Sequence, residues 1–147
     1  MADKQKLTLD QLLCFSVYST GHAFNRIYKP LLDRVGLTYP QYLVMVVLWQ
    51  EDGQTVRSIG GKLFLESSTL TPLIKRLEGA GLLTRERDRE DERQVRVMLT
   101  QQGRDLQKEA ENVPDCVFEA CGMHLDELID LNQKLVTLRT SLEKAAE

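Results

Sequence analysis

The feature that most constrains the fold is a pair of short amphipathic segments joined by a very tight turn. Apolar residues fall at helical spacing on one face of each segment: Val56, Ile59 and Leu63 in the first, and Leu70, Leu73, Ile74 and Leu77 in the second. Ser67 is a typical helix-capping residue, and residues 79–81, Gly-Ala-Gly, are typical of a helix end. Because only residues 64–66 separate the segments, the pattern predicts a helix-turn-helix, although an ordinary helical hairpin has the same periodicity.

A charged β-hairpin is expected directly after these segments. Residues 82–87 and 94–100 have the length of strands, and apolar residues at every second position from Val95 to Leu99 indicate a half-buried strand. Residues 88–93 between them are six consecutive charged residues. This is the layout of a winged helix, so the expected fold class is mainly α (α+β) with a two-stranded β wing. The charged loop is also a solvated hairpin tip, but its position after the second helix favours a role in DNA binding.

Further helices are expected before this region. We predict a first helix that begins at Thr8, with Gln11 completing a capping box, runs to about Tyr28 and is broken by Lys29-Pro30. A second capping box with proline in the first turn begins at Thr38. The residues that follow it up to position 50 are almost wholly apolar, which predicts a buried helix.

The chain returns to a helical pattern after Thr100, with a break at Val113-Pro114. Leucines in the last helix are spaced three, four, three and four residues apart, as in a coiled-coil seam: Leu128, Leu131, Leu135, Leu138 and Leu142. A stripe that packs within one chain would look similar, but a DNA-binding protein that reads two half-sites favours a homodimer. We therefore divide one intertwined domain into N-terminal helices for dimerisation and sensing (1–36), a winged helix-turn-helix (37–100) and C-terminal dimerisation helices (101–147).

Charge and cysteine content narrow the class of protein. The net charge of the 147 residues is −3, yet residues 57–104 carry ten Lys/Arg against seven Asp/Glu, and the rest of the chain carries nine against fifteen. A locally basic middle suits a small DNA-facing surface on an acidic protein. Residues 1–6 do not resemble a secretory signal, no apolar run is long enough for a membrane helix, and three cysteines are no disulfide framework. These features predict a cytoplasmic protein that does not bind a membrane.

Cys14 is the candidate for chemistry. It lies in an apolar and aromatic stretch, and the four tyrosines of the chain follow shortly after it, at positions 18, 28, 39 and 42. Phenol hydroxyls can donate hydrogen bonds that stabilise a thiolate, so this setting suits a redox sensor. The alternative is a buried cysteine that acts as a small hydrophobic residue beside core aromatics.

These features together resemble a MarR-type winged-helix repressor over nearly the whole chain. Five motifs are similar to the organic-hydroperoxide-sensing branch of that family, usually called OhrR: Leu13-Cys14-Phe15, Tyr28-Lys29-Pro30-Leu31-Leu32, Leu37-Thr38-Tyr39-Pro40-Gln41-Tyr42, Ser68-Thr69-Leu70-Thr71-Pro72-Leu73 and Asp91-Glu92-Arg93. The resemblance implies that Cys14 is the sensor, and that Tyr28 and Tyr39 reach it across a dimer interface and hydrogen-bond its thiolate. Phe15, Tyr18 and Tyr42 are candidates for the same pocket or for the core.

The resemblance leaves the fate of oxidised Cys14 open. One group in the family has a single cysteine, whereas another has a resolving cysteine from the partner subunit. The resolving position falls near Glu119 in this sequence, which departs from the pattern, and Cys116 and Cys121 flank that position. Either cysteine could resolve the oxidised sensor, and both could be ordinary small helix residues.

The DNA interface is expected on the second helix of the helix-turn-helix and on the wing. Its candidate residues are Ser67, Ser68, Thr69, Thr71, Lys75, Arg76, Arg85, Arg87, Asp91 and Arg93. Hydroxyls at a helix N-terminus suit phosphates and base edges, and the basic residues suit phosphates. Arg93 resembles the family's wing-tip arginine, which enters the minor groove, with Asp91 holding it in place.

We therefore predict a homodimeric repressor that binds a pseudo-palindromic operator in double-stranded DNA and releases it when organic hydroperoxide oxidises Cys14. No cofactor or metal is implied, since His22 and His124 are far apart in the sequence. The main alternative is a MarR-type regulator released from DNA by a small phenolic ligand, with Cys14 incidental. A thiol peroxidase that uses Cys14 as its nucleophile would leave the winged helix unexplained, so we expect no enzyme.

Overall fold

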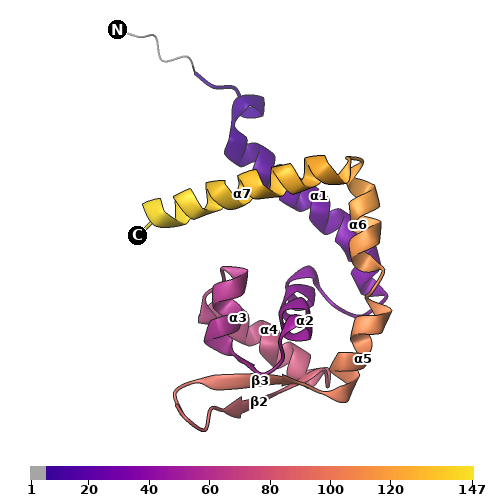
Figure 1. The fold of residues 1–147 in the computed structure, drawn as a ribbon, viewed down its shortest axis with the longest axis vertical. Coiled ribbons are helices and arrows are strands. Elements are labelled where there is room, and N and C mark those ends of the chain that lie inside the picture. The colour runs from indigo at the N-terminus through magenta and orange to yellow at the C-terminus, as the bar shows by residue number, and fades with distance from the viewer. Residues whose placement is uncertain (1–5) are drawn as a thin grey trace. The chain divides into compact units, whose positions relative to one another are not determined.

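The computed structural model describes residues 6–147 (Figure 1). The chain divides into two compact units, one up to Val113 and one over Pro114–Glu147. Residues 1–5, part of the segment in which we predict no secretory signal, lie outside the described residues. The elements of the first unit are η1 (Leu9–Gln11), α1 (Leu13–Asp33), α2 (Tyr39–Gln50), β1 (Gln54–Thr55), α3 (Val56–Leu63), α4 (Ser67–Gly79), β2 (Leu83–Arg87), β3 (Val95–Leu99) and α5 (Gln101–Glu109).

Helix α1 differs from the prediction at both ends. The Thr8 capping box is present, and the Thr8 N–H donates to Gln11 Oε1 at 3.0 Å. The box caps the N-terminus of the short 3-10 helix η1, however, and not that of α1. The predicted break at Lys29-Pro30 is wrong, since α1 continues to Asp33. Proline removes only one backbone donor here, and Leu32 in the last turn is 1% exposed, so the burial of Leu32 stabilises the turn that proline weakens.

Helix α2 is the buried centre of the first unit. Thr38 and Gln41 form the predicted capping box, in which the Gln41 N–H donates to Thr38 Oγ1 at 3.3 Å and the Thr38 N–H donates to Gln41 Oε1 at 3.0 Å. Val44, Met45 and Leu48 are at most 1% exposed, which confirms the predicted buried helix. The core around α2 is completed by apolar side chains of the later elements: Ile59, Leu70, Ile74, Leu77, Leu83 and Val97.

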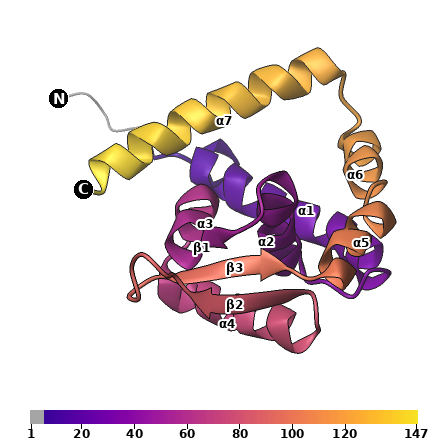
Figure 2. The same cartoon turned by 60° about the horizontal axis from the view of Figure 1, so that its bottom comes forward.

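The helix-turn-helix consists of α3 and α4 (Figure 2). The turn is tight because Gly60 has no side chain: a Cβ there would lie 2.7 Å from the carbonyl oxygen of Leu65. Phe64 adopts the left-handed conformation, with φ of 57°. The expected cap of α4 is wrong in detail, since Glu66 is the N-cap residue, no side chain caps the helix, and Ser67 is its first residue.

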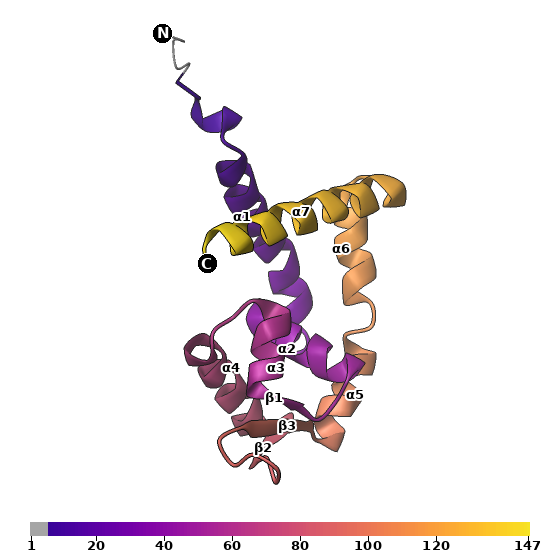
Figure 3. The same cartoon turned by 60° about the vertical axis from the view of Figure 1, so that its left-hand side comes forward.

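The wing is a three-stranded antiparallel sheet with the order β1-β3-β2 (Figure 3). Strands β2 and β3 pair from Leu83 opposite Leu99 to Arg87 opposite Val95, as the hairpin pattern predicts. The third strand, β1, was not predicted, because its two residues are too few to show a periodicity; Gln54 lies opposite Val97. The expected mainly helical fold with a winged helix-turn-helix is confirmed.

The second unit contains α7 (Leu125–Ala145) and, except for its first residue, α6 (Val113–Cys121). The predicted helix restart at Val113-Pro114 is confirmed, and Gly122, with φ of 64°, turns the chain between the helices. None of the residues of α7, all of which the structure describes, is buried. Leu131, Leu135 and Leu142 of the predicted seam are 43%, 40% and 60% exposed, so a single chain leaves much of the seam in contact with solvent.

Candidate functional site

A groove of about 640 Å³ lies between the helix-turn-helix and the wing. Its lining comes from α3, α4 and the hairpin: Val56, Arg57, Ser67, Thr71, Ile74, Arg85, Asp91, Arg93, Gln94 and Val95. Three arginines against one aspartate make its charged side chains predominantly basic. The groove therefore brings five of the predicted DNA-binding residues together, and it adds Arg57, which the sequence analysis missed because no motif marks it.

The remaining predicted residues of α4 lie outside this groove. Ser68, Thr69, Lys75 and Arg76 are exposed. Helical spacing puts them on the side of α4 opposite Leu70, Ile74 and Leu77, which are buried in the core. Thr71 differs from these hydroxyl residues, because its Oγ1 donates to the Ser67 carbonyl oxygen of its own helix at 2.7 Å. The exposed face of α4 thus carries two hydroxyls and two cations.

Arg93 projects from the wing loop and is held by a carboxylate. Its side chain is 92% exposed, whereas that of Asp91 is 33% exposed. Arg93 Nε donates to Asp91 Oδ1 at 3.1 Å, and the Arg93 backbone N–H donates to the same oxygen at 3.1 Å. Asp91 therefore fixes both the backbone of Arg93 and one edge of its guanidinium, as the family resemblance implies, and most of the side chain remains exposed.

Arg85 has a different environment, because it joins the wing to α4. Its Nε and Nη2 donate to Glu78 Oε1 at 3.2 and 3.0 Å, and its backbone N–H donates to Glu78 Oε2 at 3.1 Å. These hydrogen bonds lower the pKa of Glu78, because they stabilise the carboxylate form. The Arg85 guanidinium is thus already paired within the protein, whereas Arg87 on the same strand is exposed.

Arg96 anchors the other side of the wing. Its Nη2 donates to Asp88 Oδ2 at 2.8 Å, and its Nη1 donates to the Gly53 carbonyl oxygen ahead of β1. Hydrogen bonds from the backbone of Glu90 and from the side chain of Arg96 lower the pKa of Asp88. The base of the charged loop is therefore tied across the sheet, which limits how far the loop can swing from α4.

The candidate sensor residues do not meet within one chain. Cys14 is exposed near the start of α1, and Tyr28 lies fourteen residues later in the same uninterrupted helix. At 1.5 Å per residue, the two backbone positions are about 21 Å apart along the helix axis, which is beyond the reach of both side chains. Fourteen residues also correspond to nearly four turns, so the two side chains share one face of α1.

The tyrosines form a cluster of their own. The ring centroid of Tyr28 is 4.5 Å from that of Tyr39 and 5.9 Å from that of Tyr42. Burial raises the pKa of Tyr39, and burial together with the neighbouring Tyr39 raises that of Tyr42. Both phenols therefore keep their protons at neutral pH and can donate hydrogen bonds. Phe15 and Tyr18 lie apart on α1, 37% and 66% exposed, and Tyr18 packs edge-on against His22.

A second cavity, also of about 640 Å³, borders this cluster. It lies between one face of α1 and the segment that leads into α2, and its lining includes Tyr18, Gly21, His22, Tyr39 and Pro40. Cys14 does not line it. The cavity is thus a mostly apolar space beside the tyrosines that is large enough for a side-chain cluster or a small aromatic molecule.

Cys116 and Cys121 lie on α6, in the second unit. Cys116 is exposed and Cys121 is half-buried, and all three cysteines of the chain are free thiols. Five residues along a helix put the two thiols on different faces of α6, so they cannot act as one dithiol without a rearrangement. Within residues 6–147 no group of His, Cys, Asp and Glu side chains could hold a metal ion, and no helix could cross a membrane.

A helix-turn-helix whose second helix and β-hairpin border one basic groove defines a winged-helix DNA-binding protein. Residues 26–110 match the family model described as transcriptional regulator SarA/Rot. The chain is 39% identical over 138 residues to the organic hydroperoxide resistance transcriptional regulator of Bacillus subtilis (strain 168), with 94% of each protein covered. It is 50% identical over 139 residues to the HTH-type transcriptional regulator TtmR of Methylorubrum extorquens (strain PA1), which covers 95% of the chain and 71% of that relative.

Solved structures give the same result. Reduced AbfR bound to DNA is similar to the chain with a TM-score of 0.79 and 36% identity, and 92% of each chain is covered. AbfR of Staphylococcus epidermidis is similar with a TM-score of 0.76, 39% identity, and 90% and 91% of the two chains covered. The chain therefore belongs to the MarR/SarA family of winged-helix transcriptional regulators, which confirms the family resemblance. Its family and these relatives are DNA-binding regulators, not enzymes.

Proposed function

We propose that the protein is a homodimeric repressor in the cytoplasm that releases its DNA operator when an organic hydroperoxide oxidises Cys14. The observation that carries this proposal is the position of Cys14 and Tyr28 on one face of one straight run of helix, about 21 Å apart. Since Tyr28 and the Tyr39 ring packed on it are too distant from Cys14 of their own chain, a second copy with its α1 antiparallel would bring Tyr28 to the partner's thiol. The relationship to the Bacillus subtilis organic hydroperoxide resistance regulator supports the choice of oxidant.

The proposed chemistry is a two-electron oxidation of sulfur. The Cys14 thiolate attacks the distal oxygen of the hydroperoxide, and the O–O bond breaks as the S–O bond forms. Cysteine becomes a sulfenic acid, and the alkoxide takes up a proton and leaves as an alcohol. The hydroxyls of Tyr28 and Tyr39 would donate hydrogen bonds to the thiolate before the attack. The reaction replaces an anionic hydrogen-bond acceptor by a neutral and larger group. The hydrogen bonds that hold the tyrosines against the sulfur are therefore weakened, and the tyrosines can move.

The proposed DNA contacts use the two basic surfaces of the winged helix. The exposed face of α4 would enter the major groove, with Ser68 and Thr69 near base edges and Lys75 and Arg76 near phosphates. Arg93 at the wing would enter the adjacent minor groove. Arg57 of α3 would contact the backbone between them. Arg85 would act indirectly, because its guanidinium is paired with Glu78.

The test is the substitution Cys14→Ser. The variant should bind the operator as the unmodified protein does and should no longer release it after hydroperoxide treatment, because the serine hydroxyl cannot be oxidised. Tyr28→Phe should release the operator but should oxidise more slowly, because the thiolate loses a hydrogen bond. Electrophoretic mobility shifts would measure release, and intact mass would measure oxidation. A Cys14→Ser protein released at the same peroxide dose would show that another group is the switch.

The mass measurement also decides how oxidised Cys14 is resolved. A sulfenic acid or a mixed disulfide with an added small thiol indicates one-cysteine chemistry. A disulfide-linked dimer indicates that a cysteine of α6 resolves the sensor. One of the two single variants, Cys116→Ser or Cys121→Ser, should then lose the disulfide-linked dimer, and the other should keep it.

A second candidate function rests on the apolar cavity beside Tyr39. Such a space could hold a small phenolic ligand that displaces the protein from DNA, with Cys14 incidental. In that case Cys14→Ser would remain fully inducible by the phenol and hydroperoxide would have no effect on either protein.

A further inference from the structure

We propose that Trp49 and Gly103 are positioning residues that couple the proposed sensor to the DNA-binding wing. This inference rests on the proposed function, because it concerns how the state of Cys14 reaches the DNA. The tyrosines that would contact Cys14 are not isolated from the winged helix. They are the first members of a chain of contacts that crosses α2 and ends where the wing joins α5.

The first part of this chain is aromatic. The ring of Tyr28 packs on that of Tyr42, and the ring centroid of Tyr42 lies 6.2 Å from that of Trp49 in a T-shaped arrangement. Tyr42 and Trp49 are seven residues apart on α2, so they lie on one face of that helix. Tyr42 is 6% exposed, and a close-packed side chain cannot absorb a shift of its neighbour without moving itself. A displacement of Tyr28 is therefore passed to Trp49.

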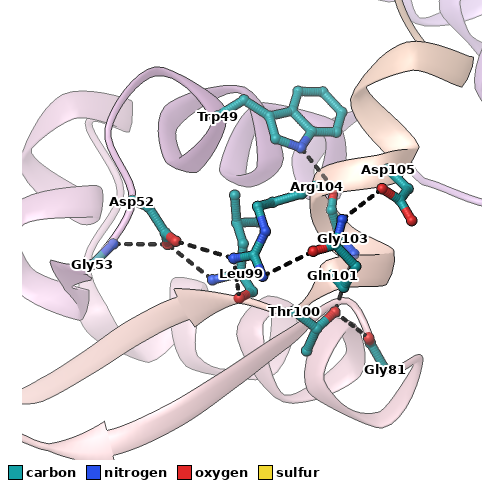
Figure 4. A network of polar contacts seen from close by, with 10 residues as sticks. All are labelled: Trp49, Asp52, Gly53, Gly81, Leu99, Thr100, Gln101, Gly103, Arg104 and Asp105. Carbon is teal, nitrogen blue, oxygen red and sulfur yellow. Dashed lines mark hydrogen bonds and ion pairs between the residues drawn. The ribbon is translucent and has the colours of Figure 1, made fainter.

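The second part is a hydrogen bond to the backbone of α5. Trp49 Nε1 donates to the Gly103 carbonyl oxygen at 2.9 Å (Figure 4). Gly103 also packs closely against the base of the wing, because a Cβ there would lie 2.0 Å from the carbonyl oxygen of Leu82, the residue before β2. The backbone of Gly103 is thus held between the indole of Trp49 and the base of the wing. A shift of the indole moves the first turn of α5 against β2.

The third part ties the same turn to the other wing strand. Asp52, just beyond α2, accepts the Leu99 N–H of β3 at 2.9 Å and forms an ion pair with Arg104 at 3.8 Å. Arg104 also donates to the Leu99 carbonyl oxygen at 3.1 Å, and Thr100 Oγ1 donates to the Gly81 carbonyl oxygen at 2.6 Å. Figure 4 shows these groups converging where α2, the wing and α5 meet. The wing therefore cannot keep its position relative to α2 if Gly103 moves.

The test compares operator affinity in the reduced and oxidised states. The factor to be measured is the ratio of operator affinity before oxidation of Cys14 to that after it, which should be greater than one in the unmodified protein. Trp49→Phe keeps an aromatic ring but removes the donor to Gly103. It should diminish that factor by about three- to tenfold, the usual contribution of one neutral hydrogen bond. The affinity of the reduced variant and the rate of Cys14 oxidation should stay close to those of the unmodified protein. A merely structural role would instead weaken both states equally.

Gln101→Ala is the matched control. Gln101 belongs to the same turn and its side chain forms hydrogen bonds with Arg104 and Asp105, but it is exposed and takes no part in the hydrogen bond between Trp49 and Gly103. The control should keep the full factor between the two states. If Trp49→Phe keeps it as well, the coupling through Gly103 is wrong while the sensor role of Cys14 stands. If the unmodified protein holds its operator after oxidation, the proposed function itself fails, and the coupling fails with it.

Fluorescence of the unmodified protein gives a second measurement that does not depend on a variant folding. Trp49 is the sole tryptophan of the chain. Oxidation of Cys14 should shift its emission, because the indole N–H leaves the Gly103 carbonyl. Cys14→Ser should show no shift under the same treatment. An emission spectrum that stays unchanged while the operator is released would overturn the coupling.

Discussion

Three arginines of the wing have similar sequence surroundings and different physical roles. Arg93 is almost fully exposed and is oriented by Asp91, so it is available to a ligand. Arg85 is bound through three hydrogen bonds by Glu78 of the recognition helix, and Arg96 is bound by Asp88 and the Gly53 carbonyl oxygen. Exposed ion pairs add little to stability. Here the ion pairs instead fix the orientation of the arginine side chains. They determine which arginine is available at the groove and which arginines hold the wing in place.

Arg93→Ala should weaken operator binding by about 1–3 kcal/mol if the guanidinium makes a specific groove contact. Arg89→Ala removes the same charge from the same loop and is the control. It should cost less, because Arg89 does not line the groove between α4 and the wing. Fluorescence anisotropy with labelled operator, at two salt concentrations, would measure both. Equal losses in the two variants would mean that only the total charge of the loop matters.

Glu78 should make the wing sensitive to acid. Its pKa is lowered in the folded protein, chiefly by the hydrogen bonds from the Arg85 side chain. The carboxylate form therefore stabilises the fold at neutral pH, and this contribution is lost as pH falls below the ordinary value of 4.5 and through the lowered one. Glu78→Gln should lower the melting temperature at neutral pH and should have less effect near pH 3, so the two curves should converge. Melting curves across that range test this, and a constant difference would exclude the ion pair as the cause.

At the scale of elements, two helices depend on features that are unusual in a helix. Helix α1 passes through Pro30 without a break, which keeps the buried Leu32 on the same element as Tyr28. Helix α3 contains two consecutive glycines, which cost helix stability, yet only Gly60 is required by its neighbours. Its missing side chain allows the carbonyl oxygen of Leu65 to approach, which sets the angle between α3 and α4.

Gly60→Ala should destabilise the protein by about 1–3 kcal/mol, because the added methyl group meets a backbone oxygen rather than a flexible side chain. Gly61→Ala is the matched control one residue later. It has open space around its Cβ and should stabilise α3 by up to about 1 kcal/mol. Urea unfolding would measure both variants. A Gly60→Ala protein as stable as the control would mean that the turn relaxes at no cost.

At the scale of the whole molecule, the proposed function needs a second copy. A single chain leaves Cys14 exposed and distant from the tyrosine cluster, and it leaves the leucine seam of α7 in solvent. A homodimer accounts for both observations and would present two recognition helices to the half-sites of an operator.

Leu135→Asp should dissociate the dimer and abolish specific binding, because a charge at the centre of a buried seam is costly and each monomer holds only one half-site. Gln133→Asp introduces the same charge away from the seam on the same helix and should leave the dimer intact. Analytical ultracentrifugation and operator binding would be measured on both variants. A monomeric Leu135→Asp protein that bound the full operator with unchanged affinity would contradict the dimeric mechanism.

The features that the sequence predicted are those that depend on local or periodic patterns. The capping box at Thr38, the helix end at residues 79–81 and the alternation in β3 each involve neighbours along the chain. Such patterns specify secondary structure before any tertiary contact forms, and here they were sufficient for the helix-turn-helix and its wing. The family motifs added the candidate sensor and its tyrosines.

The tertiary structure alone decided what depends on distant partners. Helix α1 continues through Pro30 because Leu32 is buried, and the two residues of β1 are a strand because β3 supplies their hydrogen-bond partners. Arg85 lines the groove, but its guanidinium is paired with Glu78. The bond from Trp49 to Gly103 spans 54 residues, which no periodicity reveals. Burial and long-range hydrogen bonds arise only when the chain has folded, so the sequence determined the elements, and the packing determined which side chains line the groove and which are paired within the protein.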